Sequence, residues 1–130
     1  MFTSPHHEQF QNWYNTAIIG LASQGFVRSV TDIGFGVNRC QYRGSNNTKC
    51  GIGYLIPDER YNSLTEGNSI FIHSVRNCVD PDRNWTYEEV EFLNDLQTCH
   101  DNGKIPSEMK TKLSALAIQY NLDIPKEICL

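Results

Sequence analysis

The sequence predicts an α+β fold, a small single domain in which several helices pack around a short antiparallel β-hairpin. Near both ends of the chain, apolar residues recur with the 3.6-residue period of an amphipathic helix. Between them, residues 37–56 alternate in polarity around a turn-forming segment, which is typical of a hairpin. The chain has 130 residues, of which 39% are hydrophobic and 20% charged, which is enough apolar material for one core and one domain, residues 1–130.

Residues 4–24 are expected to form the first helix. Ser4 can cap it, Pro5 suits its first turn, and Gly25 suits the residue just past its end. Gly20 is an unfavourable residue in the middle of a helix, by up to about 1 kcal/mol relative to Ala. The apolar side chains are spaced three and four residues apart and share one face: Phe10, Trp13, Tyr14, Ala17, Ile18 and Leu21.

The hairpin is predicted after an irregular segment, residues 26–36. In that segment Gly34-Phe35-Gly36 predicts a turn that places Phe35 in the core, or else a binding loop. The two arms of the hairpin are residues 37–43 and 50–56. The residues that join them, Gly44-Ser45-Asn46-Asn47-Thr48, are strong turn formers.

Two pairs of residues make the hairpin the candidate binding surface. Gly51 and Gly53 lie two apart and so share one face of the second arm, where the lack of side chains lets another backbone, helix or ligand come close. Arg39 and Arg43 share a face of the first arm, which can meet an acidic partner or a phosphate, or can simply be solvated.

Two shorter elements are expected after the hairpin. Residues 58–64 are predicted to be a short helix, because a proline precedes them and acidic residues stand at their start. Residues 69–78 fit a helical face and also contain a strand-like apolar run, and we favour the helix. A loop follows at residues 80–84.

The last part of the chain is predicted to be a helical pair. Residues 87–102 form the first helix, with Thr86 and Glu89 in the Thr-x-x-Glu pattern of a capping box. Residues 107–120 form the second, and the short connection predicts antiparallel packing. Residues 123–130 show no period and are expected to pack loosely.

Composition and cysteine spacing narrow the class of protein. Eleven Lys and Arg residues against fifteen Asp and Glu residues give a net charge of -4, which argues against binding to nucleic acid. No apolar run approaches the roughly 18 residues of a membrane span. The sequence begins with no export-signal pattern, so we expect a cytoplasmic protein with reduced cysteines. The five cysteines form no C-x-x-C pair, and we expect no metal and no cofactor.

The central block contains Cys40-Gln41-Tyr42-Arg43, the segment from Lys49 to Tyr61, Glu66-Gly67 and the segment from Leu96 to Asp101, and in these motifs it resembles a set of small uncharacterised bacteriophage and prophage proteins. Their shared phrase begins with C-x-Y-R, present here as Cys40-Gln41-Tyr42-Arg43, and continues with K-C-x-I-G-x-L-I-P-D-E-x-Y, present at residues 49–61. It ends with E-G at Glu66-Gly67 and L-Q-x-x-H-D at residues 96–101. The resemblance covers residues 38–101. It brings no activity or catalytic residue, and it implies a phage or prophage setting.

A catalytic or cation-binding function is a weaker hypothesis than the binding of a partner or a small ligand. Cys50 with His100 and Asp101 would supply the residue types of a nucleophile, a base and an orienting acid. The acidic residues Asp58, Glu59, Glu66 and Asp101 could hold a cation or act in acid–base catalysis. We expect both groups to be structural, because the sequence contains no complete catalytic signature.

The sequence therefore predicts first a non-enzymatic phage-type protein that binds and inhibits a host protein, such as a defence or regulatory factor. The alternative is a binder or sponge for a small, nucleotide-like ligand, and an enzyme is the third hypothesis. The candidate binding residues come from the hairpin and the segment that follows it: Arg39, Arg43, Gly51, Gly53, Tyr54, Asp58, Glu59 and Glu66.

Overall fold

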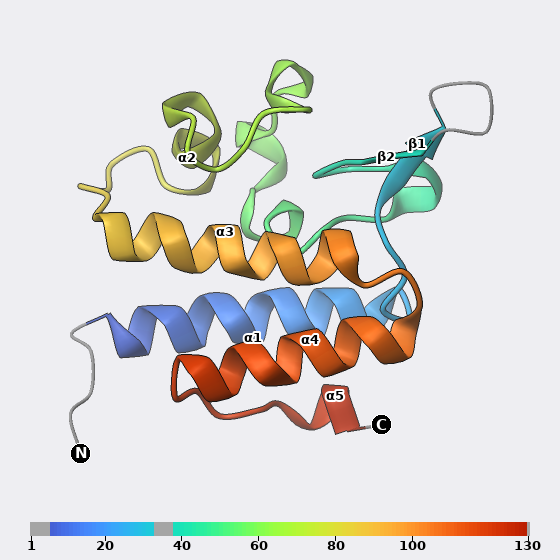
Figure 1. The fold of residues 1–130 in the computed structure, drawn as a ribbon. Coiled ribbons are helices and arrows are strands. Elements are labelled where there is room, and N and C mark those ends of the chain that lie inside the picture. Colours follow the sequence, from blue (N-terminus) through green and yellow to red (C-terminus); the bar gives the residue numbers. More distant parts are fainter. Residues whose placement is uncertain (1–5, 33–37, 130) are drawn as a thin grey trace.

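The fold of the computed structural model, which describes residues 6–32 and 38–129, is mostly helical. Its three long helices are α1 (His7–Ser23), α3 (Tyr87–Asn102) and α4 (Pro106–Gln119), which run side by side (Figure 1). The short helix α2 (His73–Val79) and the loops that follow the strands lie above α3 in this view. Helix α5 (Lys126–Cys129) lies at the opposite edge.

The prediction of an α+β fold around a hairpin over residues 37–56 is wrong. In the described part of the chain the strands are β1 (Val30–Asp32) and β2 (Asn38–Cys40), of three residues each. They pair with each other in antiparallel register, Val30 opposite Cys40. Residues 38–40 of the expected first arm therefore pair with residues before them, the arm makes only an isolated bridge to the residues after it, and the fold is closer to all-α.

The expected second arm turns instead of extending. Cys50, Ile52 and Ile56 are all buried, and the chain bends so that these residues enter the core together. The N–H of Leu55 donates to the carbonyl of Ile52 at 2.8 Å, and Gly53–Leu55 form a 3-10 turn. An apolar run with glycine at alternate positions fits a strand, but it also fits this tight turn, and burial against α1 and α3 favours the turn.

The predicted turn over residues 44–48 is present. The N–H of Gly44 donates to the carbonyl of Thr48 at 2.9 Å, and residues 45–47 form a 3-10 turn. Asn46 and Asn47 have positive φ values of 60° and 61°, a conformation that asparagine tolerates better than most residues. The turn joins Arg43 and Lys49 through an isolated bridge rather than joining two strands.

Helix α1 confirms the first predicted helix, although it begins at His7 rather than at residue 4. All six of the apolar residues predicted to share a face are buried. Gly25 follows the helix with a φ of 73°, as expected of a residue just past a helix end. The predicted cap at Ser4 and Pro5, like the Gly34-Phe35-Gly36 turn, lies outside the described residues.

The unfavourable Gly20 of α1 has a structural reason. The aromatic ring of Tyr54 lies directly on the helix backbone at this point, and a Cβ at residue 20 would fall on the ring. Glycine at position 20 therefore lowers the helix propensity of α1 but leaves room for the turn at residues 53–55 to pack on the helix.

The helical pair at the end of the chain is confirmed. Thr86 and Glu89 form the capping box: the N–H of Glu89 donates to Thr86 Oγ1 at 3.2 Å, and the N–H of Thr86 donates to Glu89 Oε1 at 2.9 Å. Pro106 stands in the first turn of α4. The two helices run antiparallel and in contact (Figure 1).

Three other expectations change. Residues 58–64 are two 3-10 turns, Asp58–Arg60 and Ser63–Thr65, rather than a helix. The helix favoured for residues 69–78 is present as α2 but starts at His73. The tail does not pack loosely, because it ends in α5 and Ile128 is buried.

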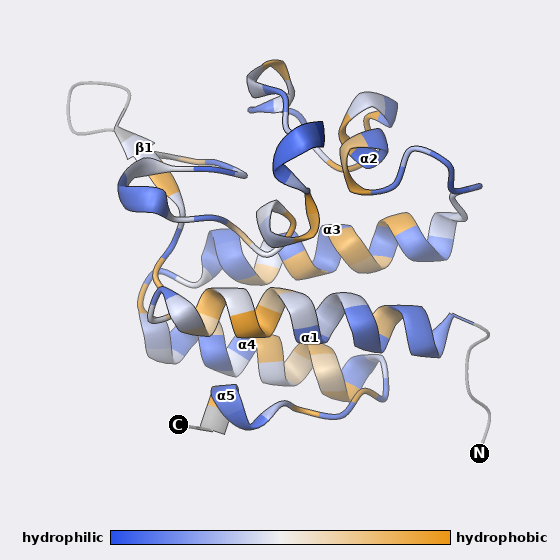
Figure 2. Cartoon of the chain, turned by 180° about the vertical axis from the view of Figure 1, so that it is seen from behind, coloured by the Kyte–Doolittle hydropathy of each residue, from blue (hydrophilic) through white to orange (hydrophobic). Residues whose placement is uncertain are grey.

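Aromatic side chains from the helices meet in the core. Along α1, α3 and α4 hydrophobic positions alternate with hydrophilic ones (Figure 2), as expected for helices with one buried face. The rings of Phe10 and Phe92 stack with centroids 4.5 Å apart, and Tyr120 meets Phe92 edge-on at 4.9 Å.

Among the described helices, none has the length and apolar character that crossing a membrane requires.

Candidate functional site

A cavity of about 550 Å³ lies between β2, the loop of residues 66–70 and one face of α3. Most of its lining groups are polar, and they come from three segments that are distant in the sequence. The lining residues are Cys40, Gln41, Tyr42, Glu66, Gly67, Asn68, Ser69, Ile70, Asn94, Gln97, Thr98 and Asp101. Among the predicted binding residues whose side chains the structure describes, Glu66 is the one that lines this cavity.

Glu66 fastens the 66–70 loop to the end of β2. Its Oε1 accepts the N–H of Tyr42 at 2.8 Å, and its Oε2 accepts the N–H of Arg43 at 3.1 Å and the hydroxyl of Tyr61 at 2.6 Å. Burial and the hydrogen bond to this carboxylate raise the pKa of Tyr61 to about 12. The carboxylate is thus held entirely by neutral donors.

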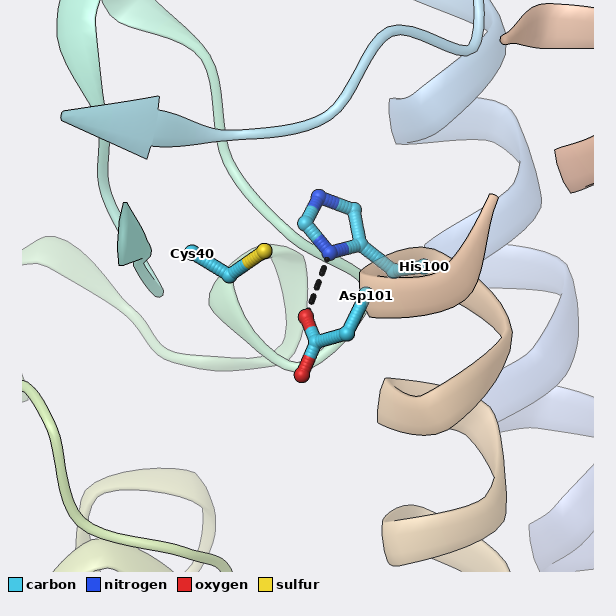
Figure 3. A group of neighbouring side chains, drawn as sticks. All are labelled: Cys40, His100 and Asp101. Atoms are coloured by element: carbon cyan, nitrogen blue, oxygen red, sulfur yellow. Dashed lines mark hydrogen bonds and ion pairs between the residues drawn. The ribbon is translucent and has the colours of Figure 1, made fainter. Parts of the chain in front are cut away.

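At the end of α3, three reactive side chain types come together: Cys40 from β2 with His100 and Asp101 (Figure 3). A sulfur, an imidazole nitrogen and a carboxylate oxygen lie within 4.8 Å of one another. Cys40, rather than the expected Cys50, is the cysteine that joins the His–Asp pair. His100 is fully buried, whereas Asp101 is partly exposed at the cavity wall.

The hydrogen bonds of His100 fix its tautomer. The backbone N–H of Ser29 donates to Nε2 at 2.8 Å, and a backbone N–H can only donate, so Nε2 carries no proton. The proton of the neutral ring is therefore on Nδ1, which donates to Oδ1 of Asp101 at 2.9 Å. His100 is a neutral bridge between residue 29 and Asp101.

This arrangement has no free imidazole lone pair. A metal ion needs an unprotonated ring nitrogen, and a general base needs one to accept a proton. In His100 one nitrogen carries the proton and the other accepts from Ser29. The cluster is therefore a hydrogen-bonded structural group, as expected of His100, and neither a zinc site nor a thiol–imidazole pair.

The neighbouring thiols are protonated at neutral pH. Burial, and then the charge of Asp101, raise the pKa of Cys40 above its ordinary value, although the guanidinium of Arg28 opposes this. Burial also raises the pKa of Cys50, which is fully buried and whose Sγ accepts the N–H of Gly53 at 3.2 Å. Since the thiolate is the nucleophile, both side chains pack rather than react.

The glycines of the expected binding face are covered by the chain itself. A Cβ at Gly51 would meet Leu96 of α3 at 3.3 Å and Ala17 of α1 at 3.7 Å, and a Cβ at Gly53 would fall on the carbonyl of Tyr42. The sequence predicts this glycine face to be a binding face, and the structure shows a surface packed against it. The surface belongs to this chain, however, so Gly51 and Gly53 offer no face to a ligand.

The remaining predicted residues have different positions and contacts. Arg43 pairs with Asp58 at 2.7 Å and lies over the ring of Tyr61 at 4.3 Å. Tyr54 packs on α1 and donates its hydroxyl proton to Gln24. Glu59 is exposed.

The backbone of Arg39 pairs with that of Thr31, while the Arg39 side chain lies outside the described part of the structure. Of the eight predicted residues, the structure thus brings Arg43, Asp58 and Glu66 into one network around Tyr61.

Apart from Asp101, which the sequence analysis considered in an acidic group, the α3 side of the cavity was missed, although the sequence contains a signal for it. Asn94, Gln97, Thr98 and Asp101 have the spacing i, i+3, i+4 and i+7, so they form a polar stripe on one face of the helix. Such a stripe is usually solvated. Here it faces the loop of residues 66–70, whose position depends on contacts far along the chain.

A second polar hollow, of about 460 Å³, lies before the N-terminus of α3. Side chains with oxygen atoms that can bind a cation stand at alternate positions there, as in the first half of a calcium-binding loop: Asp80, Asp82 and Asn84. Arg83 takes the place of a cation there, because it pairs with Asp80 at 3.3 Å and with the buried Glu89. We assign no ligand to this hollow.

Comparisons with protein-family models, with curated proteins and with solved structures gave no match to this chain. The resemblance to phage and prophage proteins stays a prediction.

Proposed function

We propose that this chain is a non-enzymatic binding protein whose cavity between β2, residues 66–70 and α3 receives a small polar molecule. The observation that carries the proposal is the cavity itself, about 550 Å³ and lined by polar groups from three separate segments. Cavities of roughly 300–1,000 Å³ are typical of small-molecule sites. A small-ligand binder was the alternative hypothesis from the sequence. We now place its binding site on the α3 side of the cavity rather than on the face of Gly51 and Gly53.

Binding is favoured over catalysis by the state of the reactive groups. The thiols of Cys40 and Cys50 have raised pKa values, and the lone pair of His100 is occupied by the N–H of Ser29. A nucleophile would need a lowered pKa or an adjacent free base. We therefore expect Cys40 to react with iodoacetamide at pH 7 more slowly than free cysteine does.

The proposal is tested by blocking the cavity. Asn94 lines it from α3, and Asn94→Trp would fill it with an indole ring. Thr111→Trp, at an exposed position of α4, is the matched control. The wild type and both variants would be screened against a set of small polar compounds by thermal shift and ligand-detected NMR.

Compounds that bind the wild type and Thr111→Trp, but not Asn94→Trp, would support the proposal. If no compound binds the wild type, or if every compound that binds does so equally well to Asn94→Trp, the cavity is not a binding site and the proposal fails.

A second candidate function is the one that the sequence favoured, a cytoplasmic phage-type protein that inhibits a host protein. Exposed apolar side chains in and just after the predicted 58–67 surface favour it: Leu64 is 82% exposed, Phe71 44% and Ile72 47%. The test compares capture from host lysate by the wild type, by Leu64→Asp and by the control Ile118→Asp on α4. A stoichiometric partner lost only with Leu64→Asp would support it, and equal capture by all three proteins would argue against it.

A further inference from the structure

The described lining of the cavity contains two carboxylates and no lysine or arginine. Glu66 and Asp101 line it, whereas none of its described lining residues is a lysine or an arginine. In the described part of the chain, the basic side chains nearby contact groups other than these two carboxylates. Arg43 pairs with Asp58, and Arg28 donates to the backbone carbonyl of Asp101 at 3.3 Å and to Sγ of the lining residue Cys40 at 3.9 Å. The charges of the two carboxylates are therefore not balanced by an ion pair with lysine or arginine.

Neutral donors hold the carboxylate of Asp101 in place. Its Oδ1 accepts from Nε2 of Gln97 at 2.8 Å and from Nδ1 of His100 at 2.9 Å. Because the bond from Ser29 keeps His100 in its neutral form, neither donor cancels the negative charge. The side chain of Asp101 is 39% exposed at the cavity wall, so this fixed charge is accessible to a ligand.

We infer that the ligand of the cavity is a small organic cation, an ammonium or guanidinium compound, that donates N–H groups to Asp101. The inference rests on the proposed function and names the ligand class of that site. A phosphate or nucleotide is disfavoured, because an anion would meet two carboxylates, and the described lining residues include no lysine or arginine. A transition-metal ion is also disfavoured, because the one imidazole at the site has no free lone pair.

Three four-carbon probes of matched length test the charge preference: 1,4-diaminobutane, 1,4-butanediol and succinate. Their affinities for the full chain would be measured by ligand-detected NMR at low ionic strength. We expect the diamine to bind at least about tenfold more tightly than the diol, which corresponds to one charge-assisted hydrogen bond. Succinate is expected not to bind.

Two isosteric variants locate the effect. Asp101→Asn keeps an oxygen for Gln97 and His100 but removes the charge, while Glu108→Gln removes a charge from an exposed position of α4. We expect Asp101→Asn to weaken diamine binding by about tenfold or more and Glu108→Gln to leave it unchanged. Raising NaCl from about 50 to about 500 mM should weaken wild-type diamine binding several-fold, which tests the charge without any variant.

The outcomes separate this inference from the proposed function. Diol or succinate binding as tightly as the diamine, blocked by Asn94→Trp and unaffected by Asp101→Asn, would overturn the cation preference and leave the binding site standing. Failure of all three probes to bind would overturn the cation inference, and failure of the wider compound screen would overturn the proposed function as well.

Discussion

The backbone N–H of Ser29 donates a 2.8 Å hydrogen bond to Nε2 of His100, and both residues are fully buried. The bond joins the segment that leads into β1 to the last turn of α3. It also sets the proton on Nδ1, and through it the orientation of Asp101 at the cavity wall. One contact between distant parts of the chain therefore determines both local stability and the chemistry of the site.

The first prediction concerns this contact. His100→Phe keeps a ring of similar size but leaves the buried N–H of Ser29 without an acceptor, and we expect a loss of about 2–3 kcal/mol in the free energy of unfolding. His100→Gln, whose side chain oxygen can still accept from Ser29, is expected to lose clearly less. Urea unfolding of the three proteins measures the difference. Equal stability of the phenylalanine variant and the wild type would contradict this view of the bond.

The second prediction concerns the close approach of Tyr54 to α1. In an ordinary helix Gly→Ala stabilises by about 1 kcal/mol, but here the added Cβ would fall on the Tyr54 ring, so Gly20→Ala should destabilise the fold. In a Tyr54→Ala background the clash is gone, and the same substitution should become stabilising. A double-mutant cycle followed by thermal unfolding would reveal this change of sign. A stabilising effect in both backgrounds would show that the ring does not press on the helix.

The helices could be predicted because their signals are local. The apolar stripe of α1 and the capping box at Thr86 and Glu89 depend on residues a few positions apart, and the structure confirms both. Residues 50–56 lack such a signal. Their glycine spacing fits a strand equally well, and the choice of a turn depends on Gly20 and Leu96, which lie 30 or more residues away.

The cavity was harder to predict than the fold for the same reason. Glu66 was among the candidates because it stands in a polar, turn-rich segment, but its hydrogen bonds to Tyr42 and Tyr61 follow from tertiary packing. Asp101 was considered in an acidic group that could hold a cation, and was expected to be structural. Its place in the cavity wall depends on how β2 and the 66–70 loop pack over α3, which residue spacing does not specify.

The third prediction concerns alkaline pH. Cys99 lies between α3 and α4, where its thiol donates to the carbonyl of Lys112 at 3.4 Å, and burial raises its pKa from 9.0 to about 11. Because the folded-state pKa is the higher one, the contribution of this thiol to stability is complete below pH 9 and is lost as the pH rises from 9 to 11. Burial raises the pKa of Cys50 as well, so it acts in the same direction.

The free energy of unfolding, measured by urea titration, should therefore fall from pH 9 to pH 11. The fall should be smaller in Cys99→Ala than in the wild type, since the variant lacks one of the shifted groups. If the two proteins lose stability in parallel over this range, Cys99 does not contribute to the alkaline transition.

The fourth prediction concerns the buried carboxylate of Glu89, whose side chain is only 2% exposed. Arg83 pairs with it while lying 5.1 Å from the ring of Trp13 and 5.7 Å from that of Trp85. Arg83→Met would keep much of the apolar contact but would remove the guanidinium from the carboxylate, which would keep His6 as its neighbour, with Nδ1 at 3.8 Å. Loss of one partner of a buried ion pair typically costs about 3–5 kcal/mol, and we expect a loss toward the lower end because Arg83 is partly exposed.

Glu89→Gln distinguishes charge from packing in that effect. The amide oxygen can still accept from the N–H of Thr86, so the capping interaction survives, while the buried charge is gone. The double variant with Arg83→Met should therefore be more stable than Arg83→Met alone, with a coupling of about 1–3 kcal/mol in a double-mutant cycle. Additive losses would mean that Arg83 stabilises the fold through its contacts with the two indole rings, and that the charge of Glu89 is not balanced by this residue.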